Sequence, residues 1–357
     1  MVFNNCIQIH FYMSIFKLLT IIIPTYNMEK YLHKCLDSLI VSDENMQRLE
    51  VLVINDGSKD SSSQIAHEYE NKYPQTFRVI DKENGNYGSC INRGLKHANG
   101  KYVKVLDADD YFDTISFENY LDYLRNCDTD VVISDFCRVD LTGAVISIKS
   151  FALPIKTPCP VTQLPSNDVV EMHAITYKTY KIREMNYTQT EGISYTDNEW
   201  SILPLINMNS FSYYPQSVYN YLVGRYGQTI DSNSLVKNRE QFLKVLYVVL
   251  SGIENKQIEN GLHKYINNRL CHAMSLIYHT LLVDDKCQHR DELVAFDEHL
   301  FSTNLELYNN IGQEKVHRFI PFRYICYWRN HGRKNILLFP VFVYNCLVSM
   351  KSLKRVI

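Results

Sequence analysis

The chain has 357 residues and a formal net charge of −2, which is long enough for a full hydrophobic core and a second, smaller unit. Hydrophobic residues make up 46% and charged residues 21% of the chain, proportions typical of a globular protein. No run of 18 uninterrupted apolar residues occurs, and this argues against a conventional membrane-spanning helix.

The charge is distributed unevenly along the chain. Residues 315–357 contain nine Lys or Arg and no Asp or Glu, which leaves 28 basic against 39 acidic residues before them, or −11. Aromatic and basic residues alternate in this tail, and the apolar run 336–350 follows them. Such a tail suits the interface of an anionic membrane, whereas the apolar run argues against a nucleic-acid partner. Packing of this run onto the rest of the chain, or against a second copy in a homodimer, is the alternative.

The ten cysteines include no C-x-x-C pair, so we expect reduced thiols in a protein that faces the cytosol. Residues 1–12 do not match the elements that follow, and Met13 is a candidate start because residues 14–17 lead directly into the first strand. An ordered extension over residues 1–16 is the alternative.

Strands and helices are predicted to alternate over the first 135 residues. Continuous β-branched and aliphatic runs predict strands buried on both faces, and apolar residues at three-to-four spacing predict the helices between them. The strands are expected at 18–24, 50–54, 77–80, 102–106 and 130–134, with a loop at 84–87 and with helices around 32–39, 60–73 and 91–98. This alternation predicts a parallel sheet covered on both faces. Residues 135–225 are less regular, as expected of a region shaped around a variable ligand, and the pattern is helical from about residue 237 onward.

An acidic cluster follows the fourth strand, at Asp107, Asp109 and Asp110. Ligands of such sheets lie outside the carboxyl ends of the strands, where residues 24–27 and 55–58 are also expected. Asp107 and Asp109 are two residues apart and should point the same way, which suits Mg²⁺ or Mn²⁺ with its preference for one or two carboxylates. The alternative is a solvated acidic turn in which Asp110 caps the helix beginning near residue 115.

Four ordered motifs make a specific pattern over residues 17–135. They are Ile23-Pro24-Thr25-Tyr26-Asn27, Val53-Ile54-Asn55-Asp56-Gly57-Ser58, Asn84-Gly85-Asn86-Tyr87-Gly88 with Asn92, and Leu106-Asp107-Ala108-Asp109-Asp110. In order and spacing they resemble the amino-terminal half of glycosyltransferase family 2. The resemblance implies the α/β GT-A fold, a Rossmann-like and mostly parallel sheet with helices on both faces, followed here by a helical carboxyl-terminal extension.

The resemblance also implies roles for individual residues in binding a nucleotide sugar. Asp56 would accept a hydrogen bond from the nucleotide base. The ring N–H of uracil is the natural hydrogen-bond donor, which favours a UDP-sugar as substrate. Asp107 would reach the ribose or the metal, and Asp109 would be the direct ligand of Mn²⁺ or Mg²⁺, which neutralises a diphosphate leaving group as a Lewis acid. The remaining residues implied at the donor site are Pro24, Thr25, Tyr26, Glu29, Gly88 and Asn92. The alternatives are that Asp56 caps the second helix, that Tyr26 packs and that Asn92 binds backbone.

Inverting transfer also needs a base for the acceptor hydroxyl. Residues 195–200 resemble the acidic motif of the family, and Asp197 aligns with its base. Thr196 stands where Glu is common, so Glu199 remains a rival base or an acceptor contact. The spacing of Thr196 and Glu199 also fits a capping box at a helix start, and Pro204 is expected to end that helix.

A further segment, residues 219–229, resembles bacterial polysaccharide transferases of the same family. Arg225, assisted by Gln228, is expected to close over the donor diphosphate. A strand followed by a surface turn is the alternative.

Together these patterns predict five regions: an extension at 1–16, a nucleotide-sugar half at 17–135, an acceptor half at 136–235, a helical extension at 236–314 and a membrane-associating tail at 315–357. The expected protein is an inverting glycosyltransferase that adds one sugar to a polysaccharide or lipid-linked glycan of bacterial capsule, exopolysaccharide or lipopolysaccharide. It would act in the cytoplasm, peripherally associated with the inner face of the membrane. An inactive glycan-binding scaffold is one alternative. A sugar-phosphate nucleotidyltransferase is another, although residues 24–27 are not the glycine- and lysine-rich loop that it would need.

Overall fold

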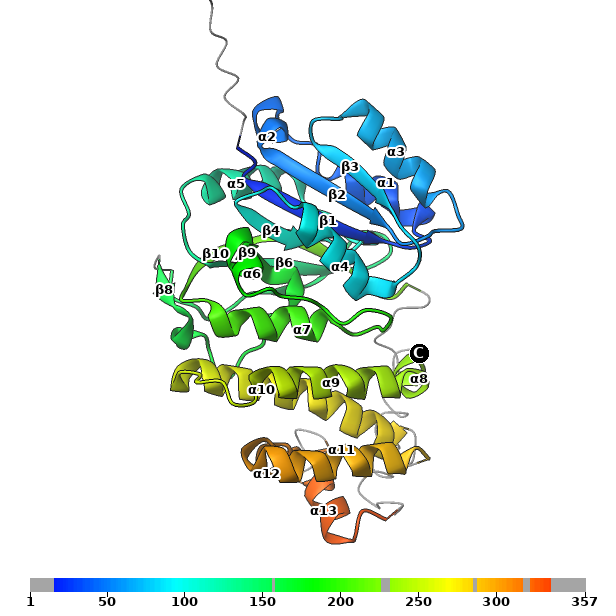
Figure 1. Cartoon of the computed structure of the whole chain (residues 1–357), viewed down its shortest axis with the longest axis vertical. Helices are drawn as coiled ribbons and strands as arrows, with labels where there is room; N and C mark the ends of the chain where they lie inside the picture. The colour runs from blue at the N-terminus through cyan, green and yellow to red at the C-terminus, as the bar shows by residue number, and fades with distance from the viewer. Residues whose placement is uncertain (1–15, 156–157, 226–231, 285–287, 317–321, 335–357) are drawn as a thin grey trace, which may run out of the picture.

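The computed structural model describes residues 16–155, 158–225, 232–284, 288–316 and 322–334. Its parts are stacked along the long axis, with the mixed sheet at one end and layers of helices at the other (Figure 1). Helix α7 lies between the sheet and the layer of α9 and α10, and α11 to α13 form the far end.

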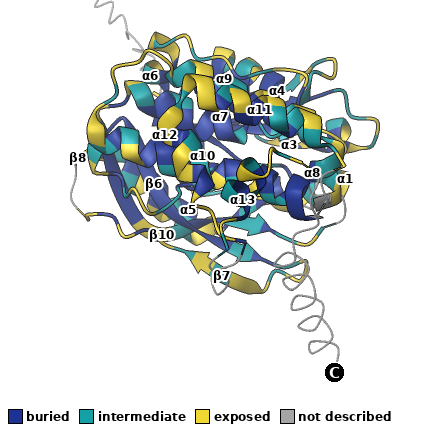
Figure 2. Ribbon diagram, turned by 90° about the horizontal axis from the view of Figure 1, so that it is seen from below, coloured by how far each residue is buried: buried dark blue, intermediate teal, exposed yellow. Residues whose placement is uncertain are grey.

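The described strands form one mixed sheet. They are β1 (Leu19–Thr25), β2 (Leu49–Asn55), β3 (Phe77–Asp81), β4 (Tyr102–Val105), β5 (Tyr111–Phe112), β6 (Val131–Val139), β7 (Val145–Lys149), β8 (Cys159–Pro160), β9 (Ile175–Lys178) and β10 (Ser210–Leu222). The strand order is β3-β2-β1-β4-β9-β6-β10-β5, with β7 paired to β6 and β8 paired to β10. Strand β7 lies at the rim and is coloured largely as exposed in Figure 2.

The helices cover the sheet and then build the extension. They are α1 (Glu29–Asp37), α2 (Asp43–Arg48), α3 (Ser62–Lys72), α4 (Asn86–His97), α5 (Thr114–Arg125), α6 (Thr179–Glu184), α7 (Asp197–Ile202), α8 (Ser232–Lys237), α9 (Arg239–Ile253), α10 (Asn260–His279), α11 (Arg290–Thr303), α12 (Leu305–Gly312) and α13 (Tyr324–Asn330). Short 3₁₀ turns lie at Val161–Gln163, Met172–Ala174 and Leu203–Asn207, and a π-helical turn lies at Thr280–Asp284.

The predicted mostly parallel sheet is confirmed in its amino-terminal half. Strand β1 pairs in parallel with both β2 and β4, so Ile21 lies beside Val51 on one side and Lys104 on the other. The chain runs from β1 through β2 to β3 and then returns past β1 to β4. Right-handed crossovers therefore place α1 and α3 on one face and α4 on the other. Strand β9 departs from the pattern because it runs antiparallel between β4 and β6, and it carries the turn before it to the carboxyl edge.

Two local expectations were wrong. The segment predicted as a loop at 84–87 already contains the start of α4 at Asn86, because the carboxylate of Asp56 accepts from the amides of Gly85 and Asn86, both at 2.9 Å. Asp110 does not cap α5. Asp113 caps it instead, accepting from the amide of Ser116 at 2.9 Å.

The described part of the basic tail packs on the helical extension. In α13 the side chains of Tyr324 and Trp328 are buried. Arg329 and Arg333 both bind the fully buried Asp297 of α11, with Arg329 Nη2 and Arg333 Nε at 2.7 and 2.8 Å from its carboxylate. Tyr324, Trp328, Arg329 and Arg333 are thus engaged within the protein, whereas Arg323 is exposed. The membrane contact expected of the tail stays a prediction. The apolar run 336–350 and the basic residues after it lie outside the described residues. No helix among the described residues combines the length and the apolarity needed to cross a membrane.

We expect the substitution Asp297→Ala to lower the free energy of unfolding by roughly 3–5 kcal/mol, because it leaves the buried side chain of Arg329 and the partly buried side chain of Arg333 without a counter-charge. Asp291→Ala on the same helix is the matched control, since the side chain of Asp291 is 95% exposed and a surface ion pair contributes little. Urea unfolding measures both variants. Equal effects of the two substitutions would show that the pairing with Asp297 does not hold the tail in place.

Candidate active site

Asp107 lies just beyond β4, with its carboxylate in a polar pocket. Its Oδ1 accepts from the hydroxyl of Tyr87 at 2.8 Å, and its amide donates to the hydroxyl of Tyr219 at 3.2 Å. Burial raises the pKa of Asp107 to about 7, and the charge of Asp109 adds to the rise. A buried carboxylate of this kind has little water around it, so its charged form is stabilised by a cation or by a hydroxyl donor.

Asp110 turns into the core and ties the acidic segment to β10. Its Oδ2 accepts from the hydroxyl of Tyr219 at 2.6 Å and its Oδ1 from the amide of Leu222 at 2.7 Å. Burial, followed by the charges of Asp109 and Asp107, raises the pKa of Asp110 well above its ordinary value. Asp110 therefore anchors the segment, a role that the sequence did not suggest.

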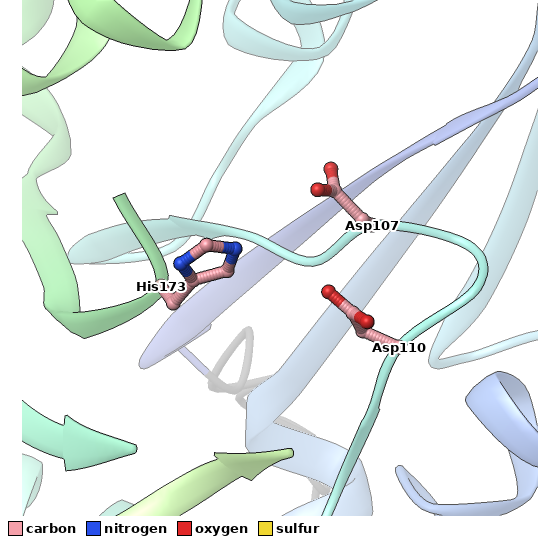
Figure 3. Close-up of side chains that lie close together, drawn as sticks. All are labelled: Asp107, Asp110 and His173. Carbon is pink, nitrogen blue, oxygen red and sulfur yellow. The ribbon is translucent and has the colours of Figure 1, made fainter. Parts of the chain in front are cut away.

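His173 is a site residue that sequence reasoning missed. One ligand atom each from Asp107, Asp110 and His173 lie within 4.8 Å of one another, and the three side chains point toward a shared space (Figure 3). The ring stacks on Tyr221 with centroids 4.4 Å apart, and Nδ1 is buried with no hydrogen-bond partner among the described residues. Burial, then the charge of Lys104, lowers the pKa of His173 to about 3, so the imidazole is neutral and able to bind a metal. The turn before the antiparallel strand β9 brings it here.

Asp109 is not one of that group of three and pairs with Arg225. The guanidinium Nε of Arg225 donates to Asp109 Oδ2, and both side chains are largely buried. The structure thus brings together two residues with separate predicted roles, the metal ligand and the diphosphate contact. Gln228 lies outside the described residues.

The loops after β1 and β2 meet beside this segment. Glu29 Oε2 accepts from the amide of Ser61 at 3.0 Å, and Asp60 Oδ2 accepts from the amide of Glu29 at 3.1 Å. Tyr26 is 45% exposed, which argues against the alternative that it packs in the core. Pro24 is partly buried and Thr25 is buried at the end of β1.

Asp56 is more constrained than a free base-binding group. Besides the two amides at the start of α4, its carboxylate accepts from the ammonium of Lys82. It does not cap α3, whose first turn is bound instead by Asp60 Oδ1, an acceptor for the amide of Ser62 at 3.0 Å. Asp56 therefore fixes the loop that presents Tyr87 to Asp107.

Asp197 and Glu199 lie in different surroundings. Burial raises the pKa of Asp197. After burial and the charge of Asp109, the charge of Asp197 further raises the pKa of Asp107. Helix α7, which begins at Asp197, packs against the turn Met172–Ala174 that carries His173. Glu199 is fully buried, its Oε2 accepts from the amide of Thr190 at 2.9 Å, and its Oε1 has no partner among the described residues. The predicted capping box does not form, because Thr196 gives α7 no side-chain cap. Helix α7 ends at Ile202, before Pro204 as expected.

Gly88 and Asn92 lie on the face of α4 that meets residues 187–192. A Cβ on Gly88 would come within 2.0 Å of the carbonyl oxygen of Thr190. Asn92 Oδ1 accepts from the amide of Gln189 at 2.8 Å and its Nδ2 donates to the carbonyl of Gln189 at 2.9 Å. Both residues thus contact the acceptor half, and for Asn92 this is the backbone-binding alternative.

Comparison with known proteins matches part of this chain to a family. The family described as "Glycosyl transferase family 2" matches residues 20–179, which span β1 to β9 and the acidic segment. The chain carries a glycosyltransferase family 2 domain. An uncharacterized glycosyltransferase of Mycoplasma pneumoniae is 39% identical over 121 residues, covering 33% of this chain and 39% of the relative.

A second relative extends past the family 2 domain. The poly(ribitol-phosphate) β-N-acetylglucosaminyltransferase TarS of Staphylococcus aureus is 27% identical over 248 residues, covering 69% of this chain and 42% of the relative. The chain thus spans less than half the length of these curated relatives.

Solved structures show the GT-A fold. TarS residues 1–349 in complex with UDP superpose with a TM-score of 0.63 at 19% identity, covering 88% of this chain and 92% of that chain. The mannosyltransferase PcManGT of Pyrobaculum calidifontis, in complex with GDP-mannose and Mn²⁺, gives a TM-score of 0.50 at 15% identity, covering 82% of each chain.

Proposed function

We propose that the chain is an inverting glycosyltransferase that transfers one sugar from a UDP-sugar to a glycan or lipid-linked glycan acceptor. One observation carries the proposal: helix α7, which begins at Asp197 in the acceptor half, packs against the turn Met172–Ala174, whose His173 lies beside Asp107 at the carboxyl edge of the donor half. A base and a donor-binding carboxylate on opposite sides of one site are what a single displacement requires.

In this proposal Asp197 takes the proton of the acceptor hydroxyl as that oxygen attacks the anomeric carbon. Tyr87 holds one oxygen of Asp107, so the other oxygen is left to face the donor. Arg225 leaves Asp109 and binds the donor diphosphate, which offers its guanidinium a bidentate partner. Pro24, Thr25, Tyr26, Glu29 and Asp56 border the nucleoside, with Asp56 acting through the loop that it fixes.

We propose a divalent cation held by Asp107 and by Asp109 once Arg225 has left it. His173 is a further candidate donor, because it offers a ligand atom within 4.8 Å of those of Asp107 and Asp110. An imidazole among carboxylates disfavours Mg²⁺, which prefers oxygen ligands, so we propose Mn²⁺. Bound there, the cation would supply Lewis-acid neutralisation of the diphosphate leaving group. The Mn²⁺ complex of PcManGT supports this choice.

The donor and acceptor classes rest on the relatives. TarS has been solved with UDP and with UDP-GlcNAc. Its name refers to poly(ribitol-phosphate), and the name of GgaB of Bacillus subtilis refers to the biosynthesis of minor teichoic acid. We propose an acceptor of this general kind, in capsule, exopolysaccharide or lipopolysaccharide assembly. A cytoplasmic location is supported by Cys35, Cys90, Cys127 and Cys137, which are buried thiols outside any disulfide.

Thermal unfolding with UDP, UDP-GlcNAc and GDP-mannose, each with Mn²⁺ or EDTA, tests the donor site. We expect UDP with Mn²⁺ to stabilise the chain by about 2.7 kcal/mol at 100 times its dissociation constant, and GDP-mannose to act more weakly. Release of UDP from the stabilising nucleotide sugar then tests catalysis. Metal-independent binding of UDP with no turnover would favour the inactive scaffold, and the absence of any nucleotide effect would exclude both proposals.

A further inference from the structure

Residues 187–192, here called the strap, run along α4 on the face that carries Gly85, Gly88 and Asn92. The amide of Gly192 donates to the carbonyl of Gly85 at 2.8 Å, and Gly88 lets the backbone at Thr190 come close. The spacing of three and four residues puts these contacts on one side of the helix. The strap is therefore fixed to the helix whose first turn presents Tyr87 to Asp107.

The side chain of Asn92 holds the centre of the strap. It accepts from the amide and donates to the carbonyl of the same residue, Gln189, and it also donates to Glu191 Oε1 at 2.8 Å. These two hydrogen bonds hold the peptide units on either side of Gln189 and so fix the orientation of its backbone as well as its position. The fixed backbone also fixes the direction in which the side chain of Gln189 extends from the strap.

That side chain ends on the residue before Asp197. Gln189 is 2% exposed, and its Nε2 donates to the carbonyl of Thr196 at 2.8 Å and to Thr196 Oγ1 at 2.9 Å. Thr196 is fully buried at the N-cap position of α7. The hydroxyl of an N-cap Thr usually accepts from an amide of the first turn, but here it caps nothing and binds Gln189.

The arrangement joins the two halves of the site through one amide group. Donor-side helix α4 holds Gln189 through Asn92, and Gln189 holds the backbone that begins the helix carrying Asp197. The amide of Thr190 reinforces the junction by donating to Glu199 within the same helix at 2.9 Å. A displacement of one ångström between a base and its substrate can cost about 100-fold in rate, so a direct tie of this kind bears on catalysis.

We propose that Gln189 is a positioning residue for Asp197. Through its hydrogen bonds to Thr196 it would set the distance between the base and the nucleotide sugar bound at the carboxyl edge of the sheet. The role rests on the proposed function, in which Asp197 is the base. Gln189 is buried, and its side-chain amide is bound to Thr196, so it is not offered to either substrate. Its loss should therefore slow turnover while leaving donor binding intact.

The pair Thr196→Val and Thr196→Ser tests the hydrogen bond between Gln189 and Thr196 from the side of its acceptor, the Thr196 hydroxyl. Valine keeps the branched shape and removes the hydroxyl that Gln189 binds, whereas serine keeps the hydroxyl. With a donor from the thermal screen, we expect Thr196→Val to lower kcat roughly 10-fold with the donor KM within about twofold, and Thr196→Ser to retain most of the rate. Thr179→Val is the matched control, because Thr179 is also buried and its Oγ1 has no partner among the described residues.

Gln189→Met tests the same hydrogen bond from the side of its donor, in case Thr196→Val folds poorly. Methionine fills a similar buried volume and donates no hydrogen bond. We expect a fall in kcat of about 100-fold, with the number of UDP molecules bound per chain unchanged. A merely structural role would instead lower that number together with the rate.

Unchanged kcat in folded Gln189→Met and Thr196→Val chains, beside an active wild type, would overturn the positioning role alone. A wild type that binds UDP and releases none from any nucleotide sugar would overturn the proposed function, and the positioning role with it.

Discussion

Replacing Asp197 by Asn is expected to lower kcat by about 100- to 10,000-fold, the range that a positioned general base contributes. Asparagine keeps the shape of the side chain and cannot take the proton of the acceptor hydroxyl. Because the base acts on the acceptor, the affinity for UDP with Mn²⁺ should stay within about twofold of the wild type. Steady-state kinetics and calorimetric titration with UDP measure the two quantities separately.

The pH dependence of kcat gives an independent check on the same residue. Burial raises the pKa of Asp197, and the base must be ionised to act. The rate should therefore fall as the pH drops through that raised pKa, and this acidic limb should lie above the ordinary aspartate range and be absent in Asp197→Asn. Glu199→Gln is the companion variant. If it lost the rate while Asp197→Asn kept it, the base would be Glu199.

Asp109→Asn is expected to remove most of the effect of Mn²⁺. Asparagine cannot neutralise the cation, and the loss of a group that stabilises charge in the transition state typically costs about 100- to 1,000-fold in kcat. Stabilisation by UDP should then become nearly the same with Mn²⁺ as with EDTA. Thermal unfolding and UDP release measure the two effects.

Asp113→Asn is the matched control for the metal prediction. Asp113 lies four residues further on, caps α5 and is exposed, so this variant should keep the full response to Mn²⁺. If Asp109→Asn kept that response as well, the cation would be held by Asp107 and His173, and Asp109 would serve only as the partner of Arg225.

The donor half of the fold was predictable because each of its elements is coded locally. The β-branched run of β1 and the apolar stripes of α1 and α4 are buried as their periodicity indicates. Errors arose where a distant group replaced a local one. The start of α4 is held by Asp56 from another loop, and the N-cap hydroxyl of Thr196 is bound by Gln189. Rules based on residue spacing consider only residues close in the sequence, so they cannot predict partners that come from distant segments.

The same limit applies to the site. Order and spacing of motifs placed the acidic residues at the correct edge of the sheet, yet gave no sign of His173, which reaches that edge because β9 runs against its neighbours. In the tail, alternating aromatic and basic residues suggested a lipid surface. The buried carboxylate of Asp297, more than 25 residues earlier, accounts for two of those cations.

The two bonds from β10 to Asp110 have a consequence for the order of folding. Tyr219 and Leu222 reach Asp110 across more than 100 residues of intervening chain, and β10 lies inside the sheet between β6 and β5. Contacts of such long range close late, since the entropy of a large loop must first be lost. During synthesis the donor motifs would thus emerge with their three carboxylates repelling one another, and the pocket would close only after β10 had been inserted. We expect a fragment that stops at residue 209 to contain the four motifs between residues 23 and 110 and yet to fail to bind UDP, which calorimetric titration would measure.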